Sequence, residues 1–153
     1  MAPALLILLI GCTADDLTHA TAHRRLRLAH PEMQWDSSRE LRADLDCDGK
    51  ADYSFLGHQP GKVFVGVVRA GGQSAQALEF AVDPGQPAAI CAKPAQLELM
   101  SLDYDPAEVS SQLEGFQRST TCYGLKLSGS GAECPPIRLY WNHNADHLAW
   151  WRP

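Results

Sequence analysis

The sequence predicts a small, mainly β domain of antiparallel strands, with one or two short helical turns and two disulfides that staple it. Short apolar or alternating runs recur between turn residues, and the chain has 12 Gly and 10 Pro. Its 153 residues suit one domain, and 45% apolar residues are enough for a hydrophobic core. Dispersed cysteines supply the third observation, since they can cross-link a small exported domain.

The N-terminal segment has the pattern of an export signal. The first eleven residues carry no charged side chain, and residues 5–10 read Leu-Leu-Ile-Leu-Leu-Ile before Gly11 and Cys12. This run is too short for a transmembrane helix, which needs about 20 residues. It matches the apolar core of a signal peptide, and the alternative is a buried N-terminal strand.

The four residues Leu9-Ile10-Gly11-Cys12 resemble the lipobox of bacterial lipoproteins. The resemblance implies that residues 1–11 are a signal peptide and that Cys12 is acylated and becomes the mature N-terminus. It therefore implies a lipid-anchored protein of the bacterial cell envelope. Thr13 follows the cysteine instead of the Asp associated with inner-membrane retention, so the expected location is the outer membrane, facing the periplasm.

Residues 12–35 are expected to form the lipid anchor and a tether, and residues 36–153 a single β-rich domain. The tether is rich in Thr, Ala, Asp and His, and it has room for a short helix with a thin apolar face. Arg24, Arg25 and Arg27 either contact anionic lipid near the anchor or form the solvated end of a linker.

Four cysteines remain besides Cys12. No two of them have the C-x-x-C spacing, which disfavours a zinc knuckle or a thioredoxin-like site. An even number of dispersed cysteines fits an oxidising compartment. Of the three possible connectivities we expect the one in which a disulfide closes a local loop, with the other two cysteines paired: Cys122–Cys134 and Cys47–Cys91.

Strands are expected wherever β-branched or alternating residues lie between turn signals. A continuous β-branched run and the run that follows Gly71-Gly72 predict a hairpin. Asp105 is expected to cap one helical turn. In chain order, the expected strands are residues 63–68, 77–82, 96–102 and 123–127, with the helical turn within residues 105–113.

The C-terminal residues predict an aromatic hairpin. Ile137, Leu139 and Trp141 alternate with Arg138 and Tyr140, residues 142–146 have turn chemistry, and residues 148–151 return. Trp150 and Trp151 must then point to opposite faces. Exposed Trp and Tyr suit partner binding or sugar stacking, so the predicted partner-binding residues are Tyr140, Trp141, Trp150 and Trp151. The alternative is that both faces are covered and the hairpin only closes the core.

Residues 44–52 read Asp-Leu-Asp-Cys-Asp-Gly-Lys-Ala-Asp. Alternate carboxylates with a Gly that permits a sharp reversal supply the hard oxygens that calcium prefers. Close carboxylates repel one another without a cation. The expected ligands are the carboxylates of Asp44, Asp46, Asp48 and Asp52, together with the backbone carbonyl of Lys50. The alternative is a solvated acidic turn.

This loop resembles the calcium loops of FG-GAP/VCBS-type repeats, in which D-x-D-x-D-G-x-x-D precedes a strand. The resemblance covers about fifteen residues and implies calcium at the four Asp positions. Phe55 stands where an EF-hand has its bidentate Glu, so the loop is not an EF-hand. A single copy cannot make a propeller, so only the loop carries over.

Several function classes lack their signals. The net charge of −5 disfavours nucleic acid as a partner. There is no nucleophile elbow, P-loop or dinucleotide fingerprint. His143 and His147 are four residues apart but flank a predicted turn, so they are expected to be surface residues. Asp103 and Asp105 have no positioned partner, which makes them weak candidates for hydrolysis.

We therefore expect a non-enzymatic envelope lipoprotein with a structural calcium ion and a protein partner. By analogy of architecture, its sharpest form is an immunity or inhibitor protein directed against a cell-wall hydrolase. The alternatives are a structural lipoprotein that binds glycan through its Trp residues and, less favoured, an envelope hydrolase.

Overall fold

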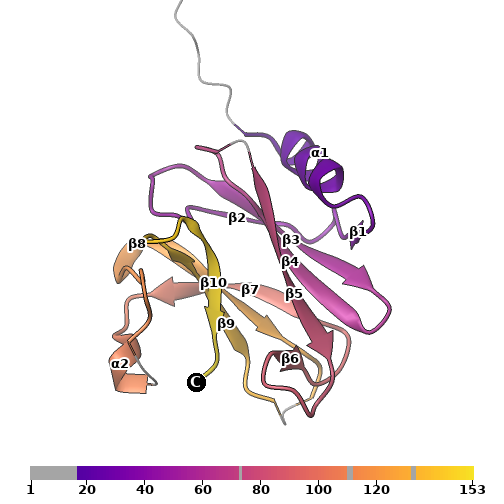
Figure 1. Cartoon of the computed structure of the whole chain (residues 1–153). Coiled ribbons are helices and arrows are strands. Elements are labelled where there is room, and N and C mark those ends of the chain that lie inside the picture. The colour runs from indigo at the N-terminus through magenta and orange to yellow at the C-terminus, as the bar shows by residue number, and fades with distance from the viewer. Residues whose placement is uncertain (1–16, 73, 110–111, 132–133) are drawn as a thin grey trace, which may run out of the picture.

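The computed structural model describes residues 17–72, 74–109, 112–131 and 134–153 (Figure 1). This part of the chain is mainly β, as predicted, with antiparallel strands, two helices and two disulfides. No described helix has the length and apolar character needed to cross a membrane. The elements are α1 (His19–Ala29), β1 (Gln34–Trp35), β2 (Leu41–Ala43), β3 (Asp52–Gln59), β4 (Lys62–Val68), β5 (Ala75–Val82), β6 (Ala89–Ile90), β7 (Gln96–Leu102), α2 (Pro106–Val109), β8 (Ser119–Ser128), β9 (Ile137–Asn142) and β10 (His147–Trp151).

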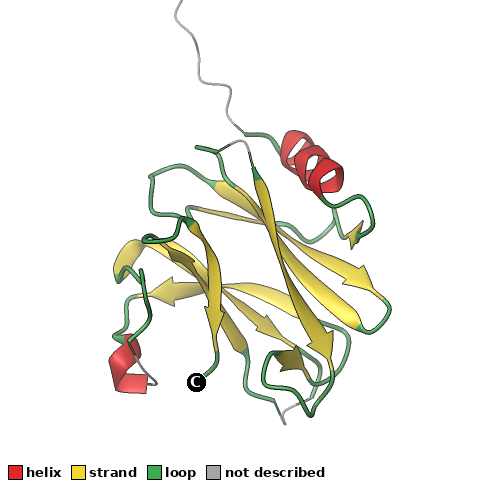
Figure 2. Ribbon diagram, in the orientation of Figure 1, coloured by secondary structure: helices red, strands yellow, loops and turns green. Residues whose placement is uncertain are grey.

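The strands form two sheets (Figure 2). Sheet A has the order β1-β3-β4-β5-β6, and β2 also pairs with β3. Sheet B has the order β10-β9-β8-β7. All pairings are antiparallel except the short parallel contact between β5 and β6. The predicted hairpin is β4–β5, in which Val65 pairs with Leu78, and the C-terminal hairpin is β9–β10.

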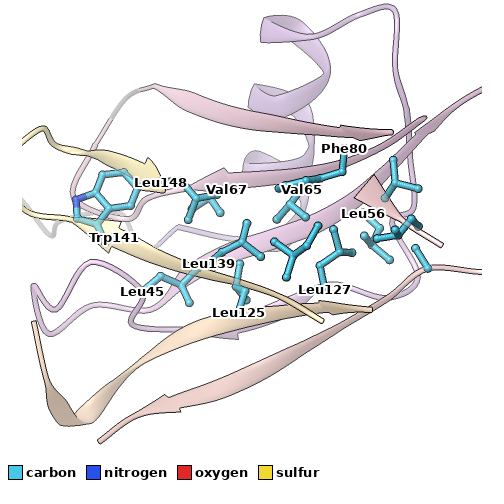
Figure 3. Packing of buried hydrophobic residues seen from close by; sticks show 14 of the residues in the cluster. Leu45, Leu56, Val65, Val67, Phe80, Leu125, Leu127, Leu139, Trp141 and Leu148 are labelled. Carbon is cyan, nitrogen blue, oxygen red and sulfur yellow. The ribbon is translucent and has the colours of Figure 1, made fainter. Parts of the chain in front are cut away.

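The main hydrophobic core lies between the two sheets (Figure 3). Val63, Val65 and Val67 reach it from β4, because alternate side chains of a strand share one face. Leu125 and Leu127 meet them from sheet B. The predicted inward set of β9 is confirmed, since Ile137, Leu139 and Trp141 all belong to this core.

Helix α1 covers the outer face of sheet A. The Thr18 hydroxyl caps its N-terminus by accepting from Thr21 N at 3.3 Å. Leu26 is fully buried and packs close to Gly66, where a Cβ would lie 2.7 Å from the Leu26 Cδ2. This cover explains why the β4 run is apolar on both faces. Residues 17–29, which we expected to belong to the tether, thus contribute to a hydrophobic cluster with Phe55 of β3.

A third cluster covers the outer face of sheet B. Tyr104 and Phe116, which flank α2, pack there with Tyr140 and Trp151. The predicted helical turn is shorter than expected, since α2 ends at Val109. Asp105 caps it as predicted, because its Oδ1 accepts a hydrogen bond from Ala107 N at 2.9 Å. Residues 110–111 of the predicted turn lie outside the described residues.

The disulfides are Cys47–Cys122 and Cys91–Cys134, so the expected pairing was wrong. Strand β8 runs without interruption from Ser119 to Ser128, which places Cys122 near its start, whereas Cys134 comes after its end. At about 3.3 Å per residue, these two cysteines are kept well apart. Each disulfide instead joins a segment next to sheet A to one in or next to sheet B, at opposite ends of the sandwich.

Candidate metal centre and its surroundings

Three carboxylates converge in the loop between β2 and β3. Asp44, Asp46 and Asp48 each offer an oxygen atom, and these atoms lie within 4.8 Å of one another. Two ligands of one calcium ion can be at most about 5 Å apart, because Ca–O distances are about 2.3–2.6 Å. Cys47 and Gly49 have φ angles of 60° and 84°, the left-handed values that turn the chain sharply between the carboxylates. The cluster can therefore hold a metal ion.

Backbone amides of the loop hold these carboxylates in place. Asp48 N lies 3.2 Å from the Oδ1 atoms of both Asp44 and Asp46, and Gly49 N donates to the Asp44 Oδ2 at 2.9 Å. Lys50 N donates to the Asp48 Oδ1 at 2.8 Å. The Asp48 side chain also reaches Gly71, where a Cβ would lie 2.5 Å from the Asp48 Oδ2, so a side chain there would displace this carboxylate. The loop therefore orients the carboxylates through its own backbone.

Asp52, the fourth predicted carboxylate ligand, is not a member of the three-Asp cluster. It is fully buried, and its two oxygens accept hydrogen bonds from Leu45 N and Ala70 N, both at 2.9 Å. Burial raises the pKa of Asp52 to about 6, although these two hydrogen bonds oppose the shift. Asp52 therefore ties the loop to the segment that follows β4. The carbonyl of Lys50 stays a predicted ligand.

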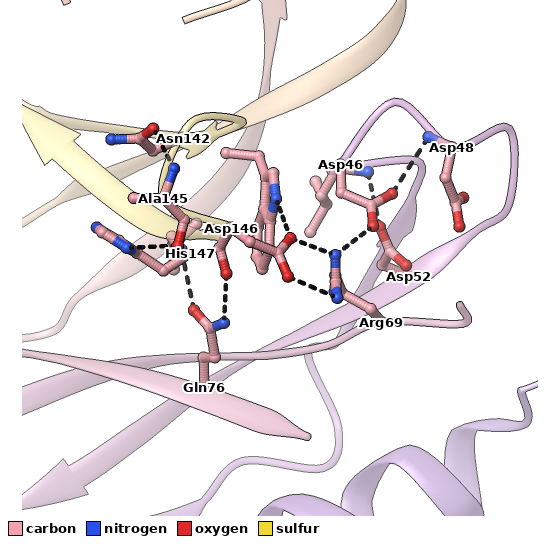
Figure 4. A network of polar contacts seen from close by, with 12 residues as sticks. Asp46, Asp48, Asp52, Arg69, Gln76, Asn142, Ala145, Asp146 and His147 are labelled. Atoms are coloured by element: carbon pink, nitrogen blue, oxygen red, sulfur yellow. Dashed lines mark hydrogen bonds and ion pairs between the residues drawn. The ribbon is translucent and has the colours of Figure 1, made fainter. Parts of the chain in front are cut away.

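Arg69, at the end of β4, is the positive group beside the cluster (Figure 4). Its guanidinium lies 3.1 Å from the Asp46 Oδ2 and 2.9 Å from the Asp146 Oδ1, and it stacks 4.6 Å from the ring centroid of Trp141. The Asp46 side chain is only 5% exposed, and burial raises its pKa while Arg69 opposes this. One guanidinium does not balance three carboxylates, so the centre still favours a cation.

The loop lies where the two sheets meet. Cys47 is bonded to Cys122 of β8, and Tyr123 N donates to the Asp44 carbonyl at 2.9 Å. On the other side of Arg69, Gln76 of β5 donates to the Asp146 carbonyl at 3.3 Å, which ties the β9–β10 turn to sheet A (Figure 4). A metal ion in the loop would thus order the junction between the sheets as well as the loop.

The predicted aromatic surface is mostly buried. Tyr140, Trp141 and Trp151 are 5%, 3% and 5% exposed, whereas Trp150 is 38% exposed. The two adjacent Trp residues do point to opposite faces, since Trp150 lies against Phe80 and Trp151 belongs to the third cluster. Of the four predicted partner-binding side chains, Trp150 alone is therefore available at the surface.

The other face of this hairpin supports a recess of about 630 Å³ around α2. Tyr104 and Phe116 line it, with ring centroids 5.3 Å apart, and Glu114 and Arg118 stand beside them. Tyr140 lies behind Phe116, at 5.6 Å between ring centroids, and its hydroxyl donates to the Glu114 carbonyl at 3.1 Å. We did not find this recess in the sequence, because its residues are scattered and form no motif.

The remaining candidates are surface residues. His143 and His147 are exposed, as expected, and Asp103 forms an exposed ion pair with Arg118 at 2.7 Å. Cys12 lies outside the described residues, so its lipidation stays a prediction. No protein family, curated protein or solved structure matches the chain.

Proposed function

We propose that this chain is a non-enzymatic lipoprotein of the bacterial cell envelope that uses a structural calcium ion and binds a protein partner. The observation that carries the proposal is the convergence of Asp44, Asp46 and Asp48 at the junction of the two sheets. A cation there offsets the mutual repulsion of the carboxylates and fixes the sheets relative to one another.

Calcium is the ion that suits this loop best. Its donors are hard carboxylate oxygens, and calcium accepts six to eight oxygens in a flexible geometry. The three carboxylates, the carbonyl of Lys50 and water can complete such a shell. Magnesium demands a stricter octahedron, and zinc prefers nitrogen or sulfur ligands. The likeness to the D-x-D-x-D-G loops of FG-GAP/VCBS-type repeats supports the same choice.

The lipobox-like sequence at Cys12 and the two disulfides support a place in the envelope. A compact domain on a lipid anchor suits the capture of a partner at the membrane. The most specific version of this proposal is that the chain is an immunity or inhibitor protein that blocks a cell-wall hydrolase. The exposed Trp150 is a natural anchor for such a contact, because Trp is enriched among the residues that dominate interface energies.

The recess around α2 favours glycan binding as a second candidate. Tyr104 and Phe116 offer aromatic faces to a sugar ring, and Glu114 and Arg118 offer polar contacts. An envelope hydrolase has less support. A glycosidase needs two carboxylates positioned on either side of the scissile bond, and of the two carboxyl residues that line the recess, Asp105 is held at the start of α2 by its capping hydrogen bond.

Calorimetric titration tests the calcium site. The protein is the chain from Thr13 onward, which contains every described element. We expect one calcium ion to bind and Asp48→Asn to abolish binding. Asp83→Asn is the matched control, because the Asp83 Oδ1 accepts from Gly85 N at 2.9 Å, the same local bond that Asp48 makes with Lys50 N. Equal calcium binding by the wild type and Asp48→Asn would overturn the site.

Two further assays test the envelope and partner proposals. Labelled palmitate should be incorporated into the full chain and not into Cys12→Ser. Inhibition of purified cell-wall hydrolases should weaken in Trp150→Ala and persist in Phe116→Ala. Binding of isolated glycan strands that is lost in Phe116→Ala, without any inhibition, would replace the first candidate by the second.

A further inference from the structure

Helix α1 carries a pair of histidines that has no part in the proposed function. His19 and His23 are four residues apart, so they share one face of the helix. Their rings are stacked, with centroids 6.1 Å apart and planes 15° apart, and both line a recess of about 570 Å³. Two histidines at this spacing on a helix can ligate one metal ion.

A carboxylate stands beside this pair. The Glu40 Oε1, just before β2, lies 3.2 Å from the His19 Nδ1. Despite this distance, the contact lacks the geometry of a hydrogen bond. Two ligands of a tetrahedral zinc ion are about 3.4 Å apart, given bonds of about 2.0–2.2 Å. The spacing of these two atoms is therefore that of neighbouring ligands.

The second histidine has a free donor atom. The His23 Nε2 is shielded from solvent and has no hydrogen-bond partner among the described residues. The ring of Phe55 supports both histidines from β3, at 5.7 Å from the centroid of His19 and 5.6 Å from that of His23. Phe55 lies in β3 of sheet A, so both histidine rings pack against a residue of the sheet.

We propose that His19, His23 and Glu40 form a zinc site. Two imidazoles and one carboxylate are a zinc donor set, and a water molecule can take the fourth position. Among the described residues, only the three-Asp cluster has its ligand atoms within 4.8 Å of one another. Zinc must therefore draw the His23 side chain toward the other two ligands by a change of rotamer.

Zinc at this site would tie α1 to sheet A. The helix otherwise rests on the sheet through Leu26 and its neighbours, and the Arg25 guanidinium donates to the Gly72 carbonyl at 3.1 Å. The nitrogen donors also separate this site from the acidic loop, because calcium prefers oxygen ligands alone. Both sites can therefore be loaded and measured in one molecule.

Cobalt and zinc titrations test the proposal, with the untagged chain from Thr13 onward kept in saturating calcium so that the acidic loop is occupied. We expect one cobalt ion to bind with a visible spectrum of nitrogen and oxygen ligation, and one zinc ion to displace it. His23→Gln and Glu40→Gln should each weaken zinc binding by about ten-fold or more, since even outer-shell changes cost roughly 10–100-fold.

The double variant His143→Gln/His147→Gln is the matched control. This pair has the same spacing but lies exposed at the two ends of the β9–β10 turn, so its loss should leave zinc binding unchanged. Thermal melts without zinc show that each variant folds. Zinc affinity that is equal in the wild type and His23→Gln, or that is lost only in the double control, overturns the site.

Discussion

Arg69 is predicted to hold the loop and the C-terminal turn together when no calcium is present. Arg69→Met keeps the apolar stem against Trp141 and removes the charge, which leaves the buried Asp46 carboxylate without its cation. Removing one partner of a buried ion pair costs about 3–5 kcal/mol. Arg69 is 20% exposed, so water replaces part of the interaction. The expected loss in the free energy of unfolding is therefore about 2–4 kcal/mol.

Calcium should reduce this loss, because the ion also compensates the charge of Asp46. By linkage, Arg69→Met should bind calcium more tightly than the wild type. Urea denaturation with calcium and with chelator measures both effects. Arg118→Met is the control, since its ion pair with Asp103 is exposed and should contribute little. A loss that is negligible in chelator, or the same size with calcium, would refute the reasoning.

Asp52 yields two further predictions. Its pKa of about 6 lies above the ordinary value of 3.8. Between these two pH values, Asp52 in the native state without calcium keeps a proton that the unfolded chain has released. Its contribution to the free energy of unfolding should fall by roughly 3 kcal/mol between about pH 4 and pH 6, measured by urea denaturation in chelator; an equal fall in Asp52→Ala would contradict this assignment. Asp52→Asn should cost about 1–3 kcal/mol near pH 4, where the native Asp52 is protonated and the substitution removes no buried charge, because its amide leaves Leu45 N or Ala70 N unpaired; no cost at that pH would contradict this role. Replacing Cys47 and Cys122 by Ala should cost about 4 kcal/mol, since this disulfide joins residues 75 apart. Peptide mapping of the wild type without reduction should recover the Cys47–Cys122 pair.

The strands could be predicted because their signals are local. The β-branched run of β4 and the alternation in β9 each follow from the period of two residues that a strand imposes. The opposite directions of Trp150 and Trp151 follow from the same rule. The acidic loop was also visible, since its carboxylates are close in sequence and the alternation that brings Asp44, Asp46 and Asp48 together is local.

Features that depend on distant contacts could not be predicted in the same way. The disulfide pairing follows from the packing of two sheets, which the spacing of the cysteines does not encode. Arg69 is a single charge at the end of an apolar strand, and only the fold brings it to Asp46 and Asp146. The metal-ligand spacing of His19 and His23 was visible, but a thin apolar face led us to expect a tether there. The burial of Ala22 and Leu26 against sheet A shows why the helix is stable.

A thermal melt of the oxidised chain from Thr13 onward, with calcium and then with excess chelator, tests the central claim most directly. We predict that calcium raises the melting temperature of the wild type and that Asp48→Asn loses this gain. In chelator, Asp48→Asn should melt no lower than the wild type, because it relieves repulsion in the loop. A wild-type melting temperature that calcium leaves unchanged would contradict the account and reduce the acidic loop to a turn.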